Sequence, residues 1–145
     1  MGRRTTFCLA ILVALALPAL ASAAPPEGSL HLKSVGTGDG PTANGFFFTE
    51  NLYERPSGKF VGTDRALCTF RPALGIPVCR LTANLPSGKL FIRLPLLPGD
   101  RGSFTVLRGT GRYQGQTGIG IYRSFPNHTN ITIWLTSKPS LGRPG

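Results

Sequence analysis

Eight short runs rich in β-branched and aromatic residues divide this chain, and turn residues such as glycine and proline bound each run. No stretch that follows the N-terminal segment repeats apolar residues at sustained helical spacing. The runs recur at intervals of roughly ten residues with hairpin-length connections, a pattern typical of all-β barrels and sandwiches. The predicted strands cover residues 30–35, 46–53, 59–70, 78–85, 89–96, 103–107, 119–125 and 129–136. The segment GTGDGPTANG, residues 36–45, is predicted to be a glycine-rich turn.

The last predicted strand alternates clearly, because Ile131, Ile133 and Leu135 share one face and the residues between them share the other. Eight antiparallel strands without a helix to cover an edge favour closure, since closure removes unpaired edges. We therefore predict a single all-β domain, an eight-stranded antiparallel β-barrel. The interior of such a barrel is either filled by side chains or holds one small ligand.

The stretch VLRGTGRYQGQTGIGIYRS, residues 106–124, contains five glycines and raises the question of a phosphate-binding loop. A dinucleotide-binding fingerprint needs G-x-G-x-x-G between a strand and a helix, with an acid about twenty residues later. Here the third glycine comes one position late, a predicted strand follows, and no acid occurs after Asp100. We therefore expect these glycines to bend the chain and to let neighbouring strands approach, not to hold phosphate.

Two segments resemble the allene oxide cyclase and dirigent barrel superfamily. VLRGTGRYQGQTGIGIY, followed by ITIWL, is similar to its G-G-T/S-G-x-Y/F-x-G-A-x-G signature, and FFFTENLYERPSGKFVGTDRALCTF is similar to its F-T-x-x-L-Y, G-x-x-x-G and small-x-Cys pattern. The resemblance implies a calycin-like eight-stranded barrel with an apolar lumen and no cofactor, commonly assembled as a homotrimer. Proteins of this kind hold a reactive small molecule and restrict its conformations, so that orientation supplies most of the catalysis.

The N-terminal segment has the pattern of a secretory signal peptide. Arg3 and Arg4 precede the apolar run FCLAILVALAL, and the small residues Ala21-Ser22-Ala23 follow it. The run is shorter than the roughly 20 apolar residues that cross a bilayer, although a retained anchor is the alternative. We expect a signal peptide over 1–23, a barrel domain over 24–136 and a disordered tail over 137–145, in an extracellular protein without a membrane anchor.

The chain is strongly basic, with 16 Lys and Arg residues against 6 Asp and Glu residues and a net charge of +10. The basic residues are dispersed and form no block of like charges, so they indicate a solvated surface and not a nucleic-acid-binding arm. We expect no nucleic-acid partner, and only a weak attraction to anionic polymers from the field of the whole protein.

Cys68 and Cys79 remain after removal of the signal peptide, which contains Cys8. The segment between them, TFRPALGIPV, contains two prolines and a glycine and can turn, so export predicts a disulfide. The alternative, a reactive thiol, needs an unpaired cysteine beside a base. His31 and His128 are isolated in the sequence, and we expect no metal site.

Glu50, in FFFTENLY, is the candidate catalytic residue. By the two-residue period of a strand it shares a face with Phe46 and Phe48, which are candidate ligand contacts, and it matches a cavity-facing asparagine of the cyclase pattern. A carboxylate in an apolar lumen has a raised pKa and can orient or protonate a ligand. Asp64 is a further candidate contact near one end of the cavity. A strand shifted by one residue would instead turn Glu50 to water, and Asp64 would then be a rim residue.

Three functions are open at this point. The first is a dirigent-like barrel that binds a small apolar or phenolic ligand and guides its coupling or cyclisation. The second is an isomerase or cyclase that uses Glu50, and the third is a structural barrel that presents loops to a partner. An open lumen of a few hundred Å³ would favour the first two, whereas a lumen filled by Phe and Ile side chains would favour the third.

Overall fold

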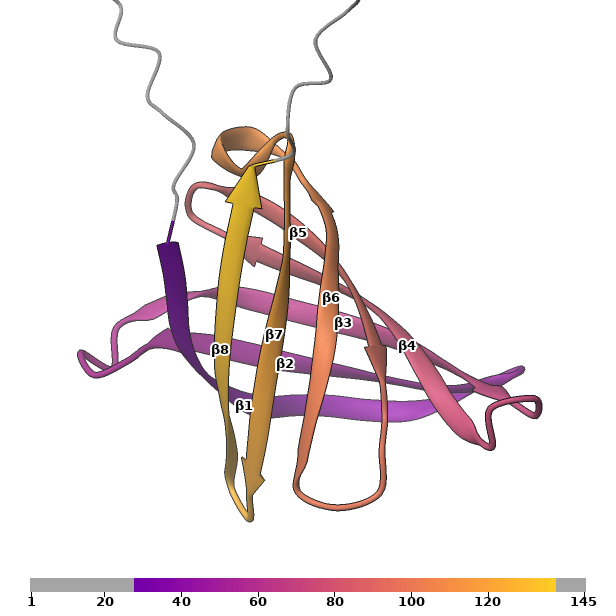
Figure 1. Ribbon diagram of the computed structural model, residues 1–145. Coiled ribbons are helices and arrows are strands. Elements are labelled where there is room, and N and C mark those ends of the chain that lie inside the picture. Colours follow the sequence, from indigo (N-terminus) through magenta and orange to yellow (C-terminus); the bar gives the residue numbers. More distant parts are fainter. Residues whose placement is uncertain (1–27, 138–145) are drawn as a thin grey trace, which may run out of the picture.

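The predicted strands close into one antiparallel barrel in the computed structural model, which describes residues 28–137 (Figure 1). Each strand pairs with the next along the chain, and β1 completes the barrel by pairing with β8. The elements are β1 Gly28–Thr42, β2 Gly45–Glu54, β3 Phe60–Arg71, β4 Ile76–Leu85, β5 Gly88–Pro95, β6 Arg101–Gly109, the 3₁₀ helix η1 Gly111–Tyr113, β7 Gln116–Phe125 and β8 His128–Ser137. The prediction of an eight-stranded antiparallel β-barrel is confirmed.

The predicted signal peptide and residues 138–145 of the predicted tail lie outside the described residues. Ser137 is the last residue of β8, one position past the expected end of the domain. Within residues 28–137, no helix has the length and apolar character needed to cross a membrane.

The prediction of a turn over residues 36–45 is wrong, because β1 continues through this glycine-rich segment to Thr42. Only Ala43 and Asn44 separate β1 from β2, and the ladder between them shifts register once, between Gly36 and Gly38. Backbone hydrogen bonds do not depend on side chains, so the phenylalanine-rich start of β2 can hold glycines in an extended ladder. This part of the β1–β2 hairpin projects beyond the segment of β1 that pairs with β8 (Figure 1).

The interior of the barrel follows the two-residue alternation of its strands. On β8, Ile133 and Leu135 are buried, while Trp134 between them is exposed. On the other strands the inward-facing side chains pack together in the same way and form one apolar core. This core includes Leu52, Leu81, Leu90, Ile92 and Val106.

The glycine stretch between β6 and β7 serves bending and close approach, as predicted. Gly111 and Gly115 have φ values of +61° and +78°, which favour glycine, and they bound the turn that contains η1. On β7, a Cβ atom at Gly120 would lie 2.1 Å from the ring of Phe104 on β6. The missing side chain at Gly120 therefore makes room for an aromatic ring inside the barrel.

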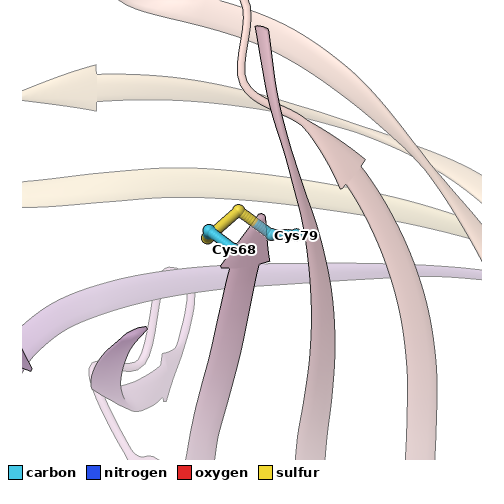
Figure 2. The surroundings of a disulfide bond; sticks show 2 residues. All are labelled: Cys68 and Cys79. Carbon is cyan, nitrogen blue, oxygen red and sulfur yellow. A yellow bond between two sulfur atoms is a disulfide. The ribbon is translucent and has the colours of Figure 1, made fainter. Parts of the chain in front are cut away.

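Cys68 and Cys79 form a disulfide, as predicted (Figure 2). The two cysteines are directly opposite each other in the β3–β4 ladder, and both are almost completely buried. The alternative of a reactive thiol is excluded for this pair. The bond belongs to the core and joins the two strands close to the turn that connects them.

Candidate ligand cavity

The barrel is not filled by its side chains but encloses a cavity of about 260 Å³. Apolar side chains from most strands make the wall: Leu32, Phe48, Leu52, Leu81, Ala83, Ile92, Leu94, Leu96, Phe104, Ile131 and Ile133. The polar lining residues are few: Glu50, Asp64, Tyr122, Ser124 and Thr129. A largely apolar cavity with a few convergent polar groups is the usual form of a small-molecule site, and the volume of this one lies slightly below the usual range.

The structure brings together the candidate catalytic residue and two of the three candidate ligand contacts. Phe48, Glu50 and Asp64 all line the cavity, and the side chain of Glu50 on this wall is partly buried. Phe46 is half-buried against the core, opposite Cys68 in the β2–β3 ladder, and is not among the cavity-lining residues. The predicted residues on β2 thus lie on one face, but that face continues past the cavity toward the disulfide.

Glu50 and Asp64 are directly opposite each other on β2 and β3. Directly opposite residues on one face have Cβ atoms roughly 5 Å apart, so the two carboxyl groups interact strongly. Burial, the Glu50 charge and a hydrogen bond with Glu50 together raise the pKa of Asp64 to about 8. Burial also raises the pKa of Glu50, and the nearby Ser34 hydroxyl and Asp64 carboxyl oppose that rise.

These shifts describe a carboxyl pair that holds a proton at neutral pH. Two carboxylates so close in an apolar wall cannot both ionise readily, so the pair shares a proton and carries about one negative charge. Asp64 is only 4% exposed, and its Oδ1 atom has no hydrogen-bond partner among the described residues. The cavity therefore offers a ligand both a proton donor and an unfilled acceptor on the same wall.

Four polar residues near this pair were missed by the sequence reasoning. Ser34 is fully buried near Glu50, with no hydrogen-bond partner for its Oγ atom among residues 28–137, and the alternation of Leu30 and Leu32 within the predicted first strand already placed it inward. Tyr122, Ser124 and Thr129 come from β7 and β8.

The hydroxyls of Ser124 and Thr129 lie 3.3 Å apart and give this end of the cavity a polar edge. Burial raises the pKa of the Tyr122 phenol, so this group stays protonated and can donate to a ligand. Three or more His, Cys, Asp or Glu side chains do not gather as a metal-binding group anywhere in residues 28–137.

The fold is a closed β-barrel with an acidic pair in an apolar lumen, an architecture consistent with a ligand-binding barrel. No protein-family model and no curated protein sequence matches the chain. Among solved structures, the barrel is similar to pyocyanin demethylase, with a TM-score of 0.61 and 21% sequence identity over 75% of this chain and 100% of that chain. This likeness extends the evidence for the fold. It does not show membership of the allene oxide cyclase and dirigent superfamily.

The expectations about secretion and oligomeric state rest on the sequence alone. The disulfide fits an oxidising compartment, and secretion stays a prediction. The homotrimer that the family resemblance implies also stays a prediction.

Proposed function

We propose that this barrel binds a small apolar or phenolic molecule in its cavity and guides the coupling or cyclisation of that molecule by restricting its conformations. The observation that carries the proposal is the carboxyl pair Glu50–Asp64 in an otherwise apolar cavity of about 260 Å³. The apolar wall selects the shape of the ligand, and the pair fixes its polar group. Orientation of this kind supplies much of the rate and the stereochemistry when a bound molecule is already reactive.

Two further observations support a small-molecule role. The resemblance to allene oxide cyclases and dirigent proteins covers segments that form β2, β3, β6, β7 and β8 of the barrel. The structurally similar pyocyanin demethylase also acts, by its name, on a small molecule. The third function considered above, a filled structural barrel, has no support from an interior that leaves this much space.

A second candidate function is isomerisation by proton transfer, favoured by the raised pKa of Asp64. Protonated Asp64 would give its proton to an oxygen or carbon of the ligand, while the Glu50 carboxylate removes a proton from a neighbouring carbon. The proton gained by Glu50 then returns to Asp64 through the hydrogen bond between them. The cycle consumes no redox equivalents, and the pair ends as it began.

Filling the cavity is the direct test of binding. Replacing Ala83, which is 3% exposed and lines the cavity, with Phe places a ring where a ligand would lie. We expect Ala83→Phe to weaken binding of the neutral probe N-phenyl-1-naphthylamine by about tenfold or more in a fluorescence titration. The matched control is Thr82→Phe, one position along β4 on the outer face, which should bind the probe as the wild type does. Equal binding by both variants would place the probe outside the barrel and contradict the proposal.

The role of the carboxyl pair is tested with phenols that displace the same probe. A phenol hydroxyl donates well to a carboxylate, and a hydrogen bond to a charged group contributes about 1.5–3 kcal/mol. Glu50→Gln is therefore expected to weaken phenol binding on the order of tenfold at pH 6, with little change in affinity for the probe itself. Glu54→Gln, on the exposed end of β2, is the control. If Glu50→Gln leaves the displacement curves unchanged, the pair does not contact the ligand, even where the cavity-filling variant shows that ligands enter.

A further inference from the structure

The outer wall of the barrel carries a second hollow, which shares Tyr122 with the lining of the lumen. It has a volume of about 600 Å³ and lies over β6, β7 and β8, three neighbouring strands of the barrel wall (Figure 1). Its lining is Arg55, Leu97, Arg101, Gly102, Ser103, Ile121, Tyr122, Arg123, Phe125, Asn130 and Thr132. We call this hollow the arginine groove, because Arg55, Arg101 and Arg123 supply its charge.

Two of these arginines face each other across the β6–β7 ladder. Arg101 and Arg123 are direct register partners, and like charges in directly opposite positions destabilise a sheet. The carboxylate near them is that of Asp100, whose Oδ1 atom lies 4.0 Å from Arg101 Nε with both side chains about two-thirds exposed. Such a long, solvated pair neutralises little of the charge. The groove therefore holds a concentration of positive charge that a bound anion would relieve.

Arg55 reaches the same groove from the β2–β3 turn and is held in place. Its Nη2 atom donates to the carbonyl oxygen of Ile131 at 3.0 Å and to Oγ1 of Thr132 at 3.3 Å. Its Nε atom is buried and has no hydrogen-bond partner in the part of the chain that the structure describes. A guanidinium fixed by the fold loses less conformational entropy on binding than a free surface arginine, so it is a better anion ligand.

The charge distribution of the whole chain also favours binding of an anion at the outer surface. Two of the six acids, Glu50 and Asp64, line the lumen, so fewer acids remain on the outer surface to offset its basic residues. An extended anion with several charges would contact the groove and then the surrounding basic wall. A single small anion would use only part of it.

We propose that the arginine groove binds an acidic polysaccharide, with its carboxylate or sulfate groups on Arg55, Arg101 and Arg123. The hydroxyl and amide groups of Ser103 and Asn130, which also line the groove, match sugar hydroxyls. Nucleic acid fits less well, because base stacking needs a free aromatic face. The ring of Phe125 is already stacked on His128 at 4.8 Å and lies under Arg123 at 5.1 Å.

The experiment uses the mature protein and four polymers: polygalacturonate, dextran sulfate, neutral dextran and single-stranded DNA. Binding is followed by titration calorimetry between 25 and 200 mM NaCl, conditions in which charge-driven binding changes strongly. Trp134, the one tryptophan of the chain, lies two residues from Thr132 on the same face of β8 and supplies a fluorescence signal. We expect one or both acidic polysaccharides to bind, with neutral dextran inert. Comparison of polygalacturonate with dextran sulfate identifies the anionic group.

The double variant Arg101→Gln/Arg123→Gln is expected to lose about tenfold or more in affinity and to show a shallower salt dependence. Arg80 and Arg93 form a matched control, because they are also opposed arginines, on β4 and β5, outside the groove. Arg80→Gln/Arg93→Gln removes the same charge and should change affinity less than about twofold. The single variant Arg123→Gln repeats the test with a smaller change to the surface. Equal losses in both double variants, tighter binding of DNA than of either polysaccharide, or no binding by any polymer would each overturn the proposal.

Discussion

Replacing Asp64 with asparagine raises the free energy of unfolding at pH 8 and removes much of the fall in stability between pH 4 and 8. The reason is the raised pKa of Asp64, about 8 in the folded barrel against 3.8 for an exposed aspartate. Between these two values the unfolded chain loses its proton while the folded chain keeps it. The folded state therefore binds more protons, and its stability falls as the pH rises, by up to about 1.4 kcal/mol per pH unit for one group.

The raised pKa of Asp64 also sets the pH range over which stability falls. Below about pH 4 both states are protonated and Asp64 costs nothing, whereas above about pH 8 both are ionised and the cost is complete. The raised pKa of Glu50 acts in the same direction. Asparagine keeps the size of the side chain and cannot ionise, so the variant should be more stable than the wild type at pH 8 by about 1 kcal/mol or more.

Urea unfolding at a series of pH values measures the effect, and the quantity of interest is the difference between variant and wild type. Carboxyl groups that do not interact with Asp64 contribute to both curves and cancel in that difference, whereas Glu50, which is coupled to Asp64, does not cancel. Asp39→Asn, at an exposed position on β1, is the control and should give a difference near zero across the range. A difference for Asp64→Asn that does not grow between pH 5 and 8 would mean that Asp64 is ionised in the folded barrel, and the shared proton would be excluded.

The sequence predicted the closed barrel and the inward-facing positions because both follow from local alternation. Glu50 could be placed on the face of Phe48, and Asp64 on the face of Cys68, by counting in twos along each strand. That the two carboxyl groups oppose each other could not be read from the chain. Their pairing depends on the β2–β3 register, which includes an irregularity between Leu52 and Tyr53. An irregularity of this kind inserts an extra residue in one strand and so changes every residue pair beyond it.

The contribution of β7 and β8 to the cavity was missed for a related reason. Tyr122 and Thr129 reach the same space as Glu50 only because the barrel closes with a particular stagger between its first and last strands. That stagger is set by the packing of the whole interior and has no local sequence signal. The glycine-rich end of β1 was missed because turn propensity was weighed without the pairing partner that overrides it.

The carboxyl pair lowers the stability of the folded barrel at neutral pH. Burying two carboxyl groups without filling the space around them costs stability, and selection for stability alone would replace them with apolar side chains. Substitution of Glu50 by leucine and of Asp64 by alanine would make this part of the cavity wall apolar. The presence of both acids on facing strands, beside the buried Ser34 hydroxyl, therefore supports the proposed binding or catalytic role of this wall.

The second large effect concerns the disulfide. Replacing Cys68 and Cys79 with alanine is expected to lower the free energy of unfolding by about 3 kcal/mol, since the bond closes a short loop in the unfolded chain. For a domain of this size the midpoint of thermal unfolding would fall on the order of 10 °C. Both cysteines are buried, so some of the loss would come from packing as well as from the cross-link. Thermal unfolding of the variant, of the wild type and of the wild type with a reductant separates the two contributions.

The disulfide-free variant also tests what holds the carboxyl pair together. Asp64 and Cys68 lie on the same inward face of β3, but Glu50 is held opposite Asp64 by the β2–β3 ladder and not by the bond to β4. We therefore expect the fall in stability between pH 4 and 8 to persist in the variant, displaced downward by a constant amount. A variant that lost both the cross-link and this pH dependence would show that the bond sets the register of β3. The cavity and its shared proton would then depend on oxidation.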